Sequence, residues 1–178
     1  VQPGSVLVGK TLAQSRIGSA AGLIVVAVER RGRVDALPSR NMVLAAGDRL
    51  MVQGRLDRFN ELRRWSDLVI EREAPVLQGL MSDRIRLAEV RIAEGSALVK
   101  DLLHHAEFRR RYGANVLAIR RGSLVRRVNL NYVPIRAGDR LLLQGSDEAL
   151  EKLEEGSDFD EVRQVTEQQL TEEYRMQE

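Results

Sequence analysis

The pattern of apolar and polar residues in the second half of the chain predicts a small α+β unit. Residues 87–92 (LAEVRI) alternate apolar and charged side chains, as a half-buried strand does. Residues 96–113 carry leucines at helical spacing and end at Gly113, so they predict one amphipathic helix with a glycine C-cap. Arginines fill the last turn of that helix, where their positive charge interacts favourably with the negative end of the helix dipole.

A hairpin and a third long strand follow in the same pattern. Residues 115–121 and 123–128 are apolar or alternating runs separated by Gly122, which predicts a β-hairpin. The run RLLLQG (140–145) predicts a further strand, and DEALEKL (147–153) predicts a closing helix. The predicted order is therefore β-α-β-β-β, followed by a helix.

The first half of the chain repeats this unit at an offset of 91 residues. AAGDRLMVQG (45–54) returns as RAGDRLLLQG (136–145), and Gly4-Ser5 returns as Gly95-Ser96. Such a unit is small and has an exposed sheet edge, so packing against a copy of itself stabilises it. We predict an α+β fold of two tandem β-α-β-β-β modules related by a pseudo-two-fold axis.

The repeat places the boundaries. We assign the first module to residues 1–62, a connector to 63–85, the second module to 86–154 and an acidic tail to 155–178. Val1 aligns with Ile92, so the first module is expected to have a truncated opening strand, as in a piece cut from a longer protein. The tail has high charge and few apolar residues, so it is interpreted as a linker or exposed helix.

Both copies contain the turn sequence AGDR, to which we assign a structural role. Gly47 and Gly138 suit a backbone with positive φ. Asp48 and Asp139 follow them and can accept hydrogen bonds from nearby backbone N–H groups.

Composition narrows the class of protein. A chain of 178 residues with 43% hydrophobic content fits one or two small domains, and the absence of cysteine excludes disulfides and thiolate sites. No apolar run reaches the ~18–20 residues that a membrane span requires. Residues 147–178 hold 12 acidic and 3 basic side chains, a net charge of −9, so residues 1–146 carry +11.

The basic excess is arginine, in clusters such as Arg109-Arg110-Arg111 and Arg120-Arg121. These clusters are solvated faces or contacts to a phosphate-bearing ligand. Seven aromatic residues in all and no recognition helix leave only nonspecific nucleic-acid affinity, and attraction to anionic lipid headgroups is equally compatible.

Two motifs suggest nucleotide hydrolysis and metal binding, but neither fits the rest of the sequence. GSVLVGKT (4–11) satisfies the phosphate-loop pattern, but its centre is apolar and the second copy reads GSALVKDL at the same place. His104 and His105 are adjacent, so they point about 100° apart on a helix and do not form an i,i+4 metal pair. We therefore expect no enzyme, no metal site and no tightly bound cofactor.

The stretches GSVLVGKTLAQSRI, GLIVVAVER and EFRRRYGANVLAIRRG, with both AGDR turns, resemble the TrkA-C (RCK-C) domain of potassium transport regulators. Tandem copies resemble the cytoplasmic insertion of bacterial permeases similar to divalent-anion/sodium symporters. The resemblance implies a regulatory or assembly module of a membrane ion or anion transporter, on the cytoplasmic side of the bacterial plasma membrane. It implies a transmembrane domain of the same polypeptide as partner, and a homodimer.

The resemblance also implies a ligand site. Some family members bind cyclic di-AMP where a helix ends and the next strand begins, and here the matching residues are Phe108, Arg109, Asn115 and Val116. A cyclic dinucleotide or an adenine nucleotide is the implied ligand. Arg110 replaces a small residue of that pattern, and the first copy has Gly18 and Ile24 where arginine and asparagine are wanted. Two alternatives stay open: Arg109–Arg111 only cap the helix, or the protein stands alone and binds nucleotides or nucleic acid through its arginine-rich surface.

Overall fold

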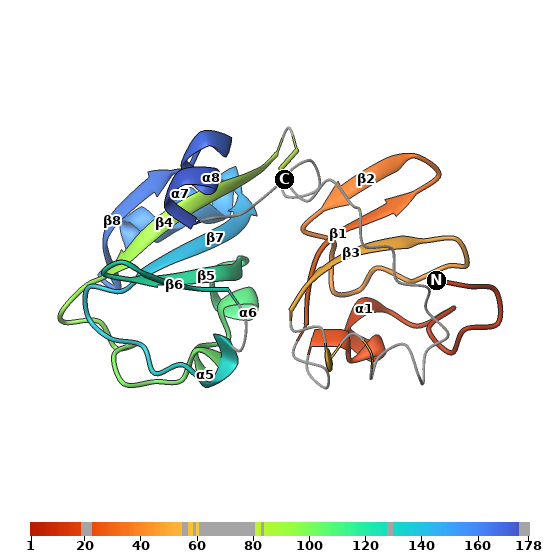
Figure 1. Cartoon of the computed structure of the whole chain (residues 1–178), viewed down its shortest axis with the longest axis horizontal. Coiled ribbons are helices and arrows are strands. Elements are labelled where there is room, and N and C mark those ends of the chain that lie inside the picture. The colour runs from red at the N-terminus through yellow and green to blue at the C-terminus, as the bar shows by residue number, and fades with distance from the viewer. Residues whose placement is uncertain are drawn as a thin grey trace. The chain divides into compact units, whose positions relative to one another are not determined.

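The chain forms two compact units, Val1–Gly79 and Leu80–Glu178 (Figure 1). The computed structural model describes residues 1–18, 23–54, 57, 58, 60, 81, 82, 84–127 and 130–174. Within these ranges no helix has the length and apolar character of a membrane span.

The second unit is built on a five-stranded antiparallel sheet with the order β6-β5-β7-β4-β8. Its strands are β4 (Ile85–Ile92), β5 (Asn115–Arg121), β6 (Leu124–Arg126), β7 (Arg140–Ser146) and β8 (Phe159–Gln164). Its helices are α5 (Leu103–Ala106), α6 (Phe108–Tyr112), the 3₁₀ turn η1 (Leu130–Tyr132), α7 (Asp147–Glu155) and α8 (Glu167–Tyr174).

The two faces of this sheet are both covered. On one face α7 packs Leu150 over Gly145, and Phe108 of α6 lies 6.1 Å from Phe159 of β8. On the other face Leu87 and Leu142 are buried. The helix α8 packs on this face, where the hydroxyl of its Tyr174 donates to Glu89 of β4. The strands β4, β5 and β7 thus form a mostly buried layer, whereas β6 at the edge is exposed.

The first unit contains α1 (Leu12–Ser15), β1 (Ile24–Arg30), β2 (Arg33–Ala36) and β3 (Arg49–Gln53). The strand order β2-β1-β3 matches β6-β5-β7 of the second unit. Thr11 and Gln14 form a capping box that starts α1. A core cluster of Leu7, Ile17, Leu23 and Leu44 holds the unit together.

The 91-residue offset recurs in individual backbone contacts. The bridge between Thr11 and Val43 corresponds to the bridge between Leu102 and Pro134. The N–H of Gly9 donates to the carbonyl of Leu44 over 2.9 Å, and its counterpart Lys100 donates to Ile135 over 2.8 Å. The predicted α+β fold of two tandem modules is confirmed, while the axis that relates them stays a prediction.

The single helix predicted for residues 96–113 is wrong. Residues 97–100 form turns, and α5 and α6 are separated by Glu107, whose φ is 47°. The physical reason is a nonlocal contact. The N–H of Leu103 donates to Val133 and the carbonyl of Asp101 accepts from Ile135, so this backbone pairs with a distant loop instead of continuing a helix.

The interpretation of residues 155–178 as a linker or exposed helix is also wrong. Residues 159–164 form β8, which pairs with β4 along its whole length, and Leu170 and Tyr174 of α8 are fully buried. Asp160 and Glu161 of β8 stay 41% and 38% exposed, and arginines of β4 and β7 pair with them at the surface of the sheet. Most of the connector 63–85 and of the closing helix of the first module lies outside the described residues, so those boundaries stay predictions.

Candidate functional site

An arginine–carboxylate pair fixes the AGDR turn of each module, and we call this pair the brace. In the second module Nε and Nη2 of Arg121 donate to the two carboxylate oxygens of Asp139, each over 2.7 Å. The backbone N–H of Arg136 adds a 2.8 Å bond to Asp139, and Arg121 also donates to the carbonyl of Pro134. Asp139 is 2% exposed, so the pair is a bidentate contact at a mostly buried carboxylate.

The first module has the same brace 91 residues earlier. Nε and Nη2 of Arg30 donate to Asp48 over 2.7 Å each, Arg30 donates to the carbonyl of Val43, and Ala45 donates its N–H to Asp48. The hydrogen bonds from Arg30 hold the pKa of Asp48 below its ordinary value. Gly47 and Gly138 have φ of 89° and 83°, a conformation that glycine adopts without strain. The AGDR sequence predicts the bonds from backbone N–H groups to the aspartate. The pairing of that aspartate with an arginine at the end of β1 or β5 is visible only in the structure.

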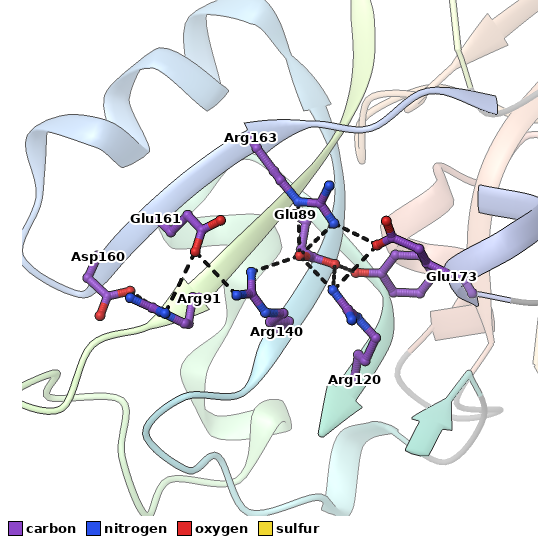
Figure 2. A network of polar contacts seen from close by, with 9 residues as sticks. Glu89, Arg91, Arg120, Arg140, Asp160, Glu161, Arg163 and Glu173 are labelled. Carbon is purple, nitrogen blue, oxygen red and sulfur yellow. Dashed lines mark hydrogen bonds and ion pairs between the residues drawn. The ribbon is translucent and has the colours of Figure 1, made fainter. Parts of the chain in front are cut away.

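A larger polar cluster, the Glu89 cluster, lies at the centre of the five-stranded sheet (Figure 2). The Glu89 side chain is fully buried and accepts hydrogen bonds from three guanidinium groups, one each from β5, β7 and β8. Arg120, Arg140 and Arg163 all approach it within 2.9–3.1 Å. The Tyr174 hydroxyl is a fourth donor, and Glu173 of α8 accepts from Arg163 over 2.6 Å.

The cluster balances its charges. Burial raises the pKa of Glu89, but hydrogen bonds from Tyr174, Arg120 and Arg163 outweigh burial, so the pKa lies below its ordinary value and the carboxylate is ionised. The surplus guanidinium charge is met by Glu173 and by Glu161, which accepts from Arg140 over 3.3 Å. Because its lone pairs are occupied, Glu89 is suited to holding α8 on the sheet and not to proton transfer.

A third polar contact joins the start of β8 to α6. Asp158 accepts hydrogen bonds from the hydroxyls of Ser96 and Tyr112, over 2.8 and 2.9 Å. Burial and the contact with Asp158 raise the pKa of Tyr112 to about 12. The hydroxyl of Tyr112 is therefore a protonated donor at neutral pH and fixes α6.

The four residues of the implied ligand site lie around Gly113, where α6 ends and β5 begins. Phe108 and Val116 are 5% and 7% exposed, and Phe108 packs on Tyr112 with ring centres 4.9 Å apart. The amide of Asn115 donates to Gln144 over 3.2 Å. Arg109 is half-buried on α6. The structure thus brings the four residues into one stretch, with two of them in the core.

The cations next to Arg109 have partners of their own. Arg110 pairs with Glu107 over 2.8 Å, and Arg111 lies over the ring of Tyr112. Among the described side chains no group of three metal-ligating residues is assembled. His104 and His105 lie on α5, but their side chains are outside the described part of the chain.

Comparison with known families decides the assignment. The model of the TrkA-C domain matches residues 1–67 and 87–155, which are the two copies of the repeat. The chain belongs to the TrkA-C domain family. The braces and the hairpins therefore belong to two successive TrkA-C domains.

Two curated proteins are similar to these TrkA-C domains. An uncharacterized transporter of Synechocystis sp. is 35% identical over 156 residues, and a putative sulfur deprivation response regulator of Chlamydomonas reinhardtii is 23% identical over 161 residues. The matches cover 84% and 85% of this chain but 26% and 27% of the relatives. The chain thus spans about a quarter of the length of the curated relatives it matches.

Solved structures with a similar chain path include RCK domains. The GsuK RCK domain has 12% sequence identity and a TM-score of 0.37, with 85% of this chain and 61% of that chain covered. The GsuK channel bound to NAD has 12% identity and a TM-score of 0.38, covering 85% and 50% of the two chains.

Proposed function

We propose that the tandem TrkA-C domains are a regulatory part of a membrane ion-transport system. The observation that carries the proposal is the 35% identity to a transporter of Synechocystis sp. over nearly the whole of this chain. In that arrangement the partner is a transmembrane domain of the same polypeptide, and the domains act on the cytoplasmic side of the plasma membrane. They work as a homodimer.

The proposed role is assembly and control, not catalysis. Three buried or nearly buried carboxylates, Asp48, Glu89 and Asp139, are all held by arginine. Each is committed to a brace or to the Glu89 cluster, which supports a structural role for these carboxylates and not a catalytic one.

Transport measurements test this proposal. Ion uptake is compared between cells that make the protein encoded by the full reading frame and cells that make it without residues 1–178. We expect both proteins to reach the membrane in equal amounts. The shortened protein should have a changed uptake rate or should no longer respond to the regulator of the full protein. A reading frame without membrane spans, whose product co-purifies with no membrane protein, would overturn the proposal.

The domains sense a small phosphate-bearing ligand, a cyclic dinucleotide or an adenine nucleotide, at the junction of α6 and β5. The support is chemical: a guanidinium at Arg109 and an amide at Asn115 suit a phosphate beside a base. The first domain has Gly18 and Ile24 at these places, so only the second domain offers this pair.

Thermal shift with cyclic di-AMP, ATP, ADP and AMP tests ligand sensing. A ligand at a hundredfold its Kd stabilises the folded state by ~2.7 kcal/mol, and Arg109→Ala should abolish the shift without lowering the melting temperature of the free protein. Arg33→Ala is the control, because Arg33 is an exposed arginine of the first domain, which lacks the arginine and asparagine of this site. If no nucleotide shifts the melting temperature, ligand sensing is refuted and only the scaffold role remains.

A further inference from the structure

The second unit exposes two large apolar side chains that its fold does not use. Leu124 of β6 and Tyr132 of η1 are each 75% exposed, and the next most exposed large hydrophobic residue of the described chain, Val43, is at 50%. Around them Arg126, Arg127 and Arg136 are exposed as well. We call Leu124, Arg126, Tyr132 and Arg136 the hairpin surface.

The charge of this region has one sign. Residues 108–138 contain eight arginines and no aspartate or glutamate. Arg120 and Arg121 are taken up by Glu89 and Asp139, and Arg110 by Glu107. The two arginines of the hairpin surface, Arg126 and Arg136, are therefore set in a segment that supplies no carboxylate of its own.

Leu124, Arg126 and the loop that carries Tyr132 and Arg136 lie on one side of the β5–β6 hairpin. Leu124 and Arg126 are two residues apart on β6 and so point to the same face. Leu124 is directly opposite Arg121, whose guanidinium reaches across to the carbonyl of Pro134. The loop that carries Tyr132 and Arg136 is thus held on the side to which Leu124 points.

The first TrkA-C domain lacks this combination. At the offset of 91 residues Arg33 replaces Leu124, Asp35 replaces Arg126 and Asn41 replaces Tyr132. Ala36 and Ala45 stand where the second domain has Arg127 and Arg136. Since the two domains share backbone contacts and braces, the fold itself does not require the exposed leucine, tyrosine and arginines.

We infer that the hairpin surface docks on a bilayer that contains anionic lipids. Guanidinium groups bind lipid phosphates and attract a negative surface, tyrosine favours the headgroup layer, and one leucine at the tip of a hairpin enters the acyl boundary. This inference does not rest on the ligand site or on the transport role, because it uses only the exposed residues of the hairpin surface.

Vesicle sedimentation with the purified chain tests the inference. Binding is measured to phosphatidylcholine vesicles with and without 30 mol% phosphatidylglycerol, at two salt concentrations. The chain should sediment with the anionic vesicles, less so at high salt. With vesicles of pure phosphatidylcholine the chain should stay in the supernatant. Arg126→Ala should lower the partition coefficient about fivefold, and Leu124→Ser about tenfold.

Arg33→Ala is the matched control, since Arg33 is an exposed arginine on the corresponding hairpin of the first domain. It should leave most of the binding in place. An equal loss in Arg33→Ala and Arg126→Ala would overturn the inference, since binding would then follow total charge. Equal binding to neutral vesicles, or unchanged binding by Leu124→Ser and Arg126→Ala, would overturn it too, and stronger retention by RNA than by anionic vesicles would assign the surface to a different partner.

Discussion

Asp139 is more than a turn residue, because its carboxylate joins three parts of the second domain. It accepts from Arg121 at the end of β5 and from the backbone of Arg136, and Arg121 in turn holds Pro134. Removing the carboxylate leaves a guanidinium that is only 35% exposed without its counter-ion. The loss therefore exceeds that of one turn hydrogen bond.

We expect Asp139→Ala to lower the free energy of unfolding by about 2–3 kcal/mol, against ~1 kcal/mol for an ordinary turn bond. Chemical denaturation followed by circular dichroism measures the difference. Asp101→Ala, at an exposed aspartate of the same domain, should change stability by less than about 0.5 kcal/mol. Equal effects of the two substitutions would contradict the role given to the brace.

A second prediction concerns the hydroxyl of Tyr174, which donates to buried Glu89. Tyr174→Phe keeps the ring but removes a hydrogen bond to a charged group, so the free energy of unfolding should fall by about 1.5–3 kcal/mol. Tyr132→Phe removes a hydroxyl at a 75% exposed position and should have no measurable effect. Urea denaturation of the three proteins checks this, and a Tyr174→Phe variant as stable as the parent would refute it.

At the scale of elements, β8 and α8 are parts of the second domain. β8 covers one edge of β4, and α8 buries Leu170 and Tyr174 over the face that contains Leu87 and Leu142. A chain that stops after Glu155 exposes this edge and this apolar face together. The domain thus extends well beyond its closing helix α7.

We expect the truncated chain 1–155 to aggregate or to lose its cooperative unfolding transition, whereas the chain 1–174 should remain folded. Size-exclusion chromatography and a thermal melt of both chains provide the measurement. A stable, monodisperse 1–155 protein would show that residues 156–174 are dispensable.

The sequence predicts the strands of the second domain well because alternation along a strand is a local signal. It fails for residues 96–103, where the backbone bonds to residues 133–135 override helical spacing. It fails again at β8, because acidic residues were interpreted as solvated. One signal could have shown that strand: Ser66-Asp67 and Ser157-Asp158 stand 91 residues apart, like the rest of the repeat.

The Glu89 cluster could not be predicted from sequence patterns. Glu89 lies 31, 51 and 74 residues from the arginines that surround it. A charged residue in an alternating strand indicates a solvent-facing side. Here that side is covered by α8, which the sequence analysis left outside the domain.

For the whole molecule, the opposite charges of the body and of residues 147–178 now have a structural reason. Asp160, Glu161 and Glu173 of β8 and α8 pair with Arg91, Arg140 and Arg120 of the preceding strands. Three of the twelve acidic residues of this segment thus supply counter-charge to arginines of the sheet.

We expect the free energy of unfolding to fall on acidification. The folded-state pKa of Asp48 and of Glu89 lies below the ordinary value, so their contribution is complete above the unfolded pKa values of about 4 and is lost as pH falls through the lowered folded values. Denaturation between pH 7 and pH 3 measures this loss.

Glu89→Gln provides the control for that pH series, because glutamine mimics the protonated carboxyl. The stability difference between the parent and Glu89→Gln should be largest near pH 7 and should shrink toward pH 3. A difference that is constant with pH would show that Glu89 is not ionised in the folded domain.

The constant 91-residue offset has a consequence for the gene. The brace, its carbonyl contact, its backbone N–H contact and the adjoining bridge recur at the same spacing in both domains. Unequal crossing-over between the two copies at the AGDR codons would stay in frame and would join the front of one domain to the back of the other with every brace partner present. Loss or gain of a whole domain is therefore a single recombination event that leaves a complete brace at the join.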